Sequence, residues 1–166
     1  MKRFLIIAVS LIIGAGANAE SFKSIYNKYH NVEDADCIEM GGFLFSLLKP
    51  IAVSEMEDDG MAVIRSLNPK GLRVLDMSDA LLSVQSDFKK DVNKVLGSKD
   101  CISLLRVHDD EDNVSISALK DGDRYKEIAI FVTGDDCTLI VFNVNATKKE
   151  LERLMKEIND NKGVQR

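Results

Sequence analysis

The sequence predicts a single α+β domain in which a mostly antiparallel sheet packs against helices. Four strand-like runs follow one another in the second half of the chain, and tight turns separate them. Amphipathic helical patterns precede and follow these runs, an order typical of α+β domains rather than of alternating strands and helices. We therefore expect a four-strand C-terminal meander that is joined by one or two earlier strands.

The first half of the folded region predicts a helix, a short strand and two less regular helical segments. Residues 21–29, SFKSIYNKY, place apolar and aromatic side chains at helical spacing. Residues 36–40, DCIEM, form a strand candidate that two glycines end. The apolar run at 43–50 suggests a buried helical turn, and Ser54 with Glu57 has the spacing of a capping box.

A second strand and a long helix follow. Residues 72–77, LRVLDM, indicate the strand. Ser78 is expected to cap a helix that begins near Asp79 and ends at Gly97. The predicted buried stripe of this helix consists of Leu81, Val84, Phe88, Val92 and Val95.

The predicted meander comprises the runs at 101–107, 114–119, 125–132 and 137–144. The Asp-Gly pair at 121–122 is a strong hairpin signal. The run at 114–119, VSISAL, alternates apolar and polar residues, so one of its faces is expected to meet water. A closing helix begins with a capping box at Thr147 and Glu150. Its apolar face holds Leu151, Leu154, Met155 and Ile158.

The ends of the chain predict export and a short tail. Residues 1–19 combine a basic start, the apolar run FLIIAVSLII and a small-residue end, so we expect a signal peptide that is cut between Ala19 and Glu20. The apolar run is too short to stay as a membrane span. Residues 20–160 then form the single domain, and residues 161–166 are expected to be a disordered tail. The protein is therefore expected to be periplasmic or secreted.

The charge of the chain argues against nucleic-acid and membrane-surface partners. The formal net charge is -5, and it becomes -7 when Lys2 and Arg3 leave with the signal peptide. An acidic protein is repelled by phosphate backbones and by anionic membrane surfaces. Another envelope protein is the more natural partner, and the sequence leaves the oligomeric state open.

An acidic stretch at 107–113, VHDDEDN, has two interpretations. Its oxygen-bearing candidates for calcium are Asp109, Asp110, Asp112 and Asn113. Counted from the first of them, the sixth and twelfth positions hold Val114 and Lys120, where an EF-hand loop needs glycine and glutamate. Asp and Asn are also good turn formers, and the stretch lies between two predicted strands. We favour a solvated hairpin turn, and an irregular calcium site is the alternative.

The three cysteines match no zinc-binding pattern. In the predicted meander, Cys101 and Cys137 lie at opposite ends of the sheet, so a disulfide between them is expected to be out of reach. A disulfide from Cys37 to Cys101 or to Cys137 stays open. The alternative is that all three are buried thiols that behave as small apolar residues.

Motifs that mark common enzyme classes are missing from the sequence. It contains no Gly-x-Ser-x-Gly elbow, phosphate loop, dinucleotide glycine pattern or His-Glu-x-x-His zinc motif. His108 beside Asp109 or Asp110 is a candidate base, but a histidine at a strand end near acids is more often a surface residue. We therefore predict no catalytic residues and no cofactor.

The chain resembles the bacterial exported proteins grouped as domain of unknown function 4252. The resemblance is carried by the signal peptide, by FKSIYNKY and LRVLDM, and above all by residues 104–154, where Lys126-Glu127 precedes an apolar strand. The family often has glycine just after the last strand, where this chain has Asn145, which also tolerates a left-handed backbone. The resemblance implies a small envelope protein of certain Gram-negative bacteria, often found with regulators of cell-surface signalling, and brings no catalytic residues with it.

These observations favour a non-enzymatic periplasmic or secreted module that binds another envelope protein or a ligand. The expected contact surface is the exposed face of residues 114–119 together with the acidic loop 109–113, because a strand near a sheet edge can accept another chain. The second hypothesis is a calcium- or small-ligand-binding domain. The third is an unrecognised hydrolase that uses His108.

Overall fold

The computed structural model describes residues 21–42, 67–108 and 112–162 of the chain. They form three helices and six strands, in the order α2 (Phe22–Tyr29), β1 (Asp36–Gly41), β2 (Gly71–Asp76), α5 (Leu82–Leu96), β3 (Cys101–His108), β4 (Asn113–Asp121), β5 (Arg124–Thr133), β6 (Cys137–Ala146) and α6 (Lys148–Lys162). The predicted signal peptide at 1–19, both helical segments between 43 and 57, and residues 163–166 lie outside the described residues.

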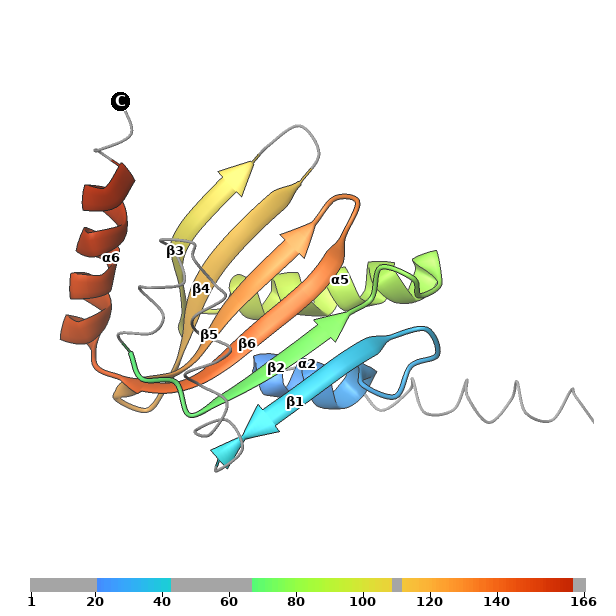
Figure 1. Cartoon of the computed structure of the whole chain (residues 1–166), viewed down its shortest axis with the longest axis horizontal. Helices are drawn as coiled ribbons and strands as arrows, with labels where there is room; N and C mark the ends of the chain where they lie inside the picture. The colour runs from blue at the N-terminus through green and yellow to red at the C-terminus, as the bar shows by residue number, and fades with distance from the viewer. Residues whose placement is uncertain (1–20, 43–66, 109–111, 163–166) are drawn as a thin grey trace, which may run out of the picture.

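The six strands form one antiparallel sheet in the order β1-β2-β6-β5-β4-β3. Strands β3 to β6 are the predicted meander, and the two earlier strands add to its β6 side. The fold class is therefore α+β with a mostly antiparallel sheet, as predicted. The order leaves β1 and β3 at the two edges of the sheet (Figure 1).

Helices α2 and α5 cover one face of the sheet (Figure 1). The four apolar residues predicted to face inward from α2 are buried: Phe22, Ile25, Tyr26 and Tyr29. Phe88 of α5 stands edge-on to Tyr29 at 5.2 Å and to Phe131 of β5 at 5.9 Å between ring centres. Edge-to-face aromatic pairs add to the stabilisation that comes from burying their area. This trio therefore fixes both helices on the sheet.

The other face of the sheet carries a second apolar cluster, to which α6 contributes Leu151. Strand β4 contributes to both clusters, with Leu119 on the α2–α5 face and Ile116 and Ala118 on the other. Ser117 is only 1% exposed, and its hydroxyl lowers the pKa of the nearby Cys101 thiol, against the larger effect of burial. The prediction that one face of residues 114–119 meets water is therefore wrong, because the alternation reflects small polar residues that lie under the helical layer.

Helix α5 begins later than predicted. Its first residue is Leu82, and Leu81 at the N-cap makes no side-chain capping bond. The Ser78 hydroxyl instead donates to Asp76 and accepts from the Cys137 backbone N–H at 3.0 Å. Ser78 therefore links β2 to β6 rather than capping the helix. Leu81 is 72% exposed and does not belong to the buried stripe, whereas Val84 is half-buried and Phe88, Val92 and Val95 are buried.

The turns and the last helix follow the predicted chemistry. Gly122 has a φ of 63° in the β4–β5 hairpin, a conformation that glycine adopts without strain. The Thr147 hydroxyl accepts from the Glu150 N–H, and the Glu150 carboxylate accepts from Thr147 in return, so the predicted capping box is present. Helix α6 continues to Lys162 and so includes the first two residues of the predicted tail.

Candidate functional site

The acidic stretch connects the two strands of the β3–β4 hairpin. His108 and Asn113 are cross-strand partners on either side of it. The His108 Nδ1 atom hydrogen-bonds the Asn113 side-chain oxygen. The histidine that was considered as a catalytic base therefore contacts an amide, and Asp109 and Asp110 lie outside the described residues.

Two of the four calcium candidates can be placed. Asp112 is half-buried, and one of its carboxylate oxygens is buried without a hydrogen-bond partner in the structure. The side-chain oxygen of Asn113 is engaged by His108. Within the described ranges, no group of three or more His, Cys, Asp or Glu side chains is arranged to hold a metal ion.

All three cysteines are free thiols, so neither of the disulfides considered for Cys37 is formed in this structure. Cys101 pairs with Leu119 and Cys137 with Thr133, at opposite ends of the meander, as the sequence predicted. Cys37 is exposed, whereas burial raises the pKa of the Cys101 thiol to about 11. Burial also raises the pKa of the Cys137 thiol.

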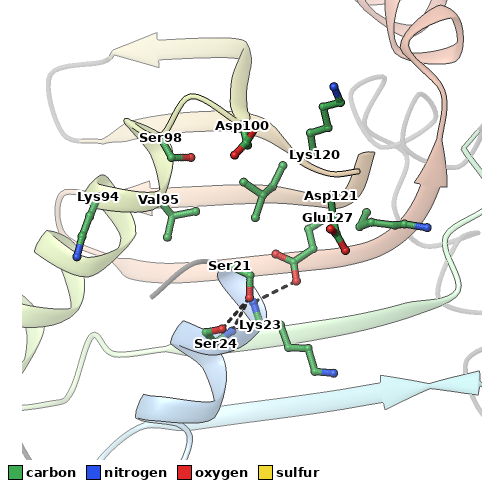
Figure 2. Close-up of a pocket in the computed structure, with 12 residues that line it drawn as sticks. Ser21, Lys23, Ser24, Lys94, Val95, Ser98, Asp100, Lys120, Asp121 and Glu127 are labelled. Atoms are coloured by element: carbon green, nitrogen blue, oxygen red, sulfur yellow. Dashed lines mark hydrogen bonds between the residues drawn. The ribbon is translucent and has the colours of Figure 1, made fainter. Parts of the chain in front are cut away.

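A hollow of about 700 Å³ lies between α2, the end of α5 and strands β4 and β5; we call it the α2–α5 hollow. Its lining mixes charges of both signs, with four lysines and three carboxylates. Figure 2 shows Ser98 and Asp100 on one side of it, Ser21 and Ser24 on the other, and Glu127 directed at the start of α2.

Glu127 is the buried charge of this hollow, at 7% exposure. Its carboxylate accepts from the backbone N–H groups of Phe22 at 2.9 Å and Lys23 at 3.2 Å. Figure 2 shows the second of these bonds as a dashed line. The next N–H, of Ser24, is satisfied by the Ser21 hydroxyl at 3.0 Å. Free N–H groups at a helix start need such partners. Burial raises the pKa of Glu127, and the two N–H bonds oppose that rise.

The Lys126-Glu127 pair, which carries part of the family resemblance, therefore has a structural role. Glu127 holds the first helix, and Lys126 donates to the Asn145 side-chain oxygen at 2.8 Å. Asn145 lies inside β6 and is not among the described residues with positive φ, so the left-handed turn that it was expected to tolerate is not formed here. The signal in the sequence was a single carboxylate in β5, directly before the apolar run at 128–132.

A second hollow, of about 540 Å³, lies between α5 and the far ends of β3, β4 and β5; we call it the α5–β3 hollow. Its charged lining residues are Lys89 of α5 and Arg106 of β3, with His108 beside them. Neutral hydrogen-bonding side chains complete the polar part of the lining: Asn93, Asn113, Ser115 and Thr133. Sequence reasoning missed this site because its residues come from four separate elements.

The β1 edge of the sheet is the third feature. Every residue of β1 is exposed except Met40, which is half-buried, and Ile38 is 52% exposed. Gly42 N–H donates to the Lys70 carbonyl across the β1–β2 ladder. In an antiparallel pair, every second residue of a strand is bonded to the partner strand, so Met40 and Ile38 bond to β2 as Gly42 does. The backbone N–H and C=O groups of Cys37, Glu39 and Gly41 therefore point away from β2.

These features define a small α+β domain with an open antiparallel sheet and two hollows beside one helix. Residues 26–156 match the family described as domain of unknown function DUF4252, and the chain belongs to that family. Neither a curated protein nor a solved structure matches the chain significantly. No helix among the described residues is both long and apolar enough to cross a membrane.

Proposed function

We propose that the protein is an exported, non-enzymatic interaction module of the bacterial envelope, whose β1 edge receives an extended segment of a partner protein. The observation that carries this proposal is the β1 edge, which no other described strand covers and on which three alternate backbone positions face outward, at Cys37, Glu39 and Gly41. Unpaired N–H and C=O groups in such a row template the addition of another strand. The export signal predicted at 1–19 would deliver the domain to the envelope.

The β1 edge suits this role better than the surface first expected. Strand β4 is bonded on both sides, to β3 and to β5, so it has no backbone groups left for a partner. At the other edge, β3 carries a register shift between Ser103 and Leu105. A bulge of this kind interrupts the ladder and twists an edge away from further pairing. No register shift interrupts β1 along its pairing with β2.

The charge on the edge selects the kind of partner. Asp36 and Glu39 lie on β1, and Asp34 precedes it. Among the described residues, Arg73 is the cation that pairs with one of them, and its guanidinium lies 2.7 Å from the Glu39 carboxylate. Two copies of β1 placed side by side would bring like charges together, which is destabilising across strands. The expected partner is therefore an extended segment that carries lysine or arginine.

Site-specific photocrosslinking in living cells tests the proposal. A benzoylphenylalanine at position 38 is expected to give one discrete adduct with an envelope protein, because Ile38 lies beside the open edge. The same probe at Leu82, which is 82% exposed at the start of α5, serves as the matched control and should give none. Mass spectrometry of the adduct identifies the partner and shows whether the processed chain begins at Glu20.

A backbone variant separates edge pairing from simple proximity. Cys37→Pro removes an outward N–H and leaves the β1–β2 bonds in place, since proline is tolerated near the start of an edge strand. It is expected to abolish the adduct, whereas Cys37→Ala should keep it. An adduct that survives Cys37→Pro, or equal adducts from positions 38 and 82, would show that the partner does not pair with β1.

A further inference from the structure

We propose that the α5–β3 hollow binds a small organic anion, whose carboxylate or phosphate group is held by Lys89 and Arg106. This site is distinct from the β1 edge, which lies at the opposite side of the sheet. Strand pairing at the β1 edge does not require a ligand in the α5–β3 hollow. An experiment can therefore contradict one of the two proposals and leave the other standing.

The register of the strands directs polar side chains into this hollow. Arg106 pairs with Ser115, and His108 pairs with Asn113. On the next strand, Ser115 and Asn113 pair with Phe131 and Thr133. Side chains alternate between faces along a strand, so these residues share the face that α5 covers, since Phe131 contacts Phe88 there. Side chains from β3, β4 and β5 therefore line the hollow opposite Lys89 and Asn93 of α5.

The charge of the described lining favours an anion. None of the described carboxylates lines this hollow. Lys89 and Arg106 make no ion pair or hydrogen bond within the described part of the chain, whereas Lys28, Arg73 and Lys148 each bind a carboxylate. Arginine and lysine in a concave surface are suited to carboxylate and phosphate groups. The α2–α5 hollow, by contrast, has three carboxylates in its lining and offers no such selectivity.

The size and the apolar part of the lining favour an organic molecule over a simple inorganic ion. A hollow of about 540 Å³ falls within the usual range of small-molecule sites. Leu96 and Phe131 supply apolar surface beside the cations. Acidic residues adjoin the lining residues in the chain, at 109–112 between His108 and Asn113 and at 135–136 after Gly134, so a ligand with more than one negative charge would be repelled. The ligand expected is a compact molecule with one anionic group and an apolar body.

A titration followed by nuclear magnetic resonance tests this inference on the full chain as the cell processes it. The probes are phenyl phosphate, benzoate, inorganic phosphate and neutral benzyl alcohol. Saturable shifts are expected at amides of Lys89, Arg106 and Thr133 with either aromatic anion, and weaker shifts with inorganic phosphate or benzyl alcohol. Comparison of phenyl phosphate with benzoate shows which anionic group the site prefers.

Paired variants decide whether the cations hold the probe. Lys89→Gln/Arg106→Gln is expected to weaken binding by about tenfold or more, because charge-assisted hydrogen bonds are lost. Lys90→Gln is the matched control, since Lys90 is exposed on the same helix and does not line the hollow. Equal weakening by Lys90→Gln, shifts centred on the α2–α5 hollow, or no saturable shifts with either aromatic anion would overturn the proposal.

Discussion

Single buried charges determine how the first helix and the sheet fit together. Glu127 satisfies two N–H groups of a helix that starts 105 positions earlier in the chain. Arg73, at 8% exposure, donates to Glu39 at 2.8 Å and to Asn143 at 2.9 Å, and lies over the Tyr26 ring. A buried charge is tolerated only when it is paired and hydrogen-bonded. Both residues meet that condition. Glu127 joins β5 to the start of α2, and Arg73 joins β2 to β1 and β6.

Replacement of Glu127 is expected to reveal a distinct dependence of stability on pH. Glu127→Gln should lower the free energy of unfolding by about 1–3 kcal/mol, because the amide offers one acceptor oxygen for two N–H groups. Burial raises the folded-state pKa of Glu127 above its ordinary value of 4.5. A raised pKa means that the contribution to stability is fully present below about 4.5 and is lost as the pH rises through the folded pKa.

Urea unfolding between pH 4.5 and pH 7 measures this effect. The difference in free energy of unfolding between the natural chain and Glu127→Gln is expected to grow as the pH falls. Glu152→Gln, on the exposed face of α6, provides the control and should show no such trend. A difference that shrinks toward acid pH would mean that the two N–H bonds outweigh burial.

At the scale of elements, α2 is attached twice, to the sheet through Glu127 and to α5 through Asp91. Asp91 accepts from Lys28 Nζ at 2.6 Å and from the Tyr29 hydroxyl at 2.9 Å. Burial alone would raise the pKa of Asp91, but these two bonds hold it below its ordinary value. Burial, followed by the bond to Asp91, raises the pKa of Tyr29. The helix is therefore fixed at both of its ends.

Two substitutions at the α2–α5 contact are expected to differ in cost. Tyr29→Phe keeps the aromatic packing on Phe88 but removes a part-buried hydrogen bond, so it should lower the free energy of unfolding by about 1 kcal/mol. Lys28→Gln removes an ion pair whose lysine side chain is 47% exposed, and such pairs contribute about 0.2–1 kcal/mol. Urea unfolding at pH 7 ranks the two. A larger loss from Lys28→Gln would show that the exposed ion pair holds the helix.

The elements that sequence reasoning predicted correctly are those with a strong local pattern. The inner face of α2 follows from helical spacing, and the capping box of α6 follows from Thr147 and Glu150 alone. Ser78 failed as a cap because Asp76 and the Cys137 backbone compete for its hydroxyl. The prediction that one face of residues 114–119 meets water failed because alternating polarity does not show whether a helix covers that face. The Glu127 contact and the two hollows depend on residues far apart in the chain, which no local pattern reports.

At the scale of the whole molecule, the strand order decides what the cysteines can do. Cys37 lies on β1 and Cys101 on β3, the two edges of the sheet. Five strand spacings separate them, or roughly 24 Å, whereas a disulfide needs Cα atoms within about 7 Å. Cys137 lies on β6, two strands from β1 and so roughly 10 Å or more from Cys37.

Thiol counting therefore tests the sheet order and the chemistry of the thiols together. In the folded protein at pH 7, only the exposed Cys37 is expected to react quickly with a thiol reagent, because burial raises the pKa values of Cys101 and Cys137 and limits access to them. After unfolding without reductant, all three should react. Cys37→Ser should abolish the fast reaction and leave the other two thiols unchanged. Fewer than three thiols in the unfolded monomer would reveal a disulfide within the chain. A disulfide of Cys37 with Cys101 or Cys137 is incompatible with the strand order β1-β2-β6-β5-β4-β3, and one between Cys101 and Cys137 is incompatible with their places at opposite ends of the meander.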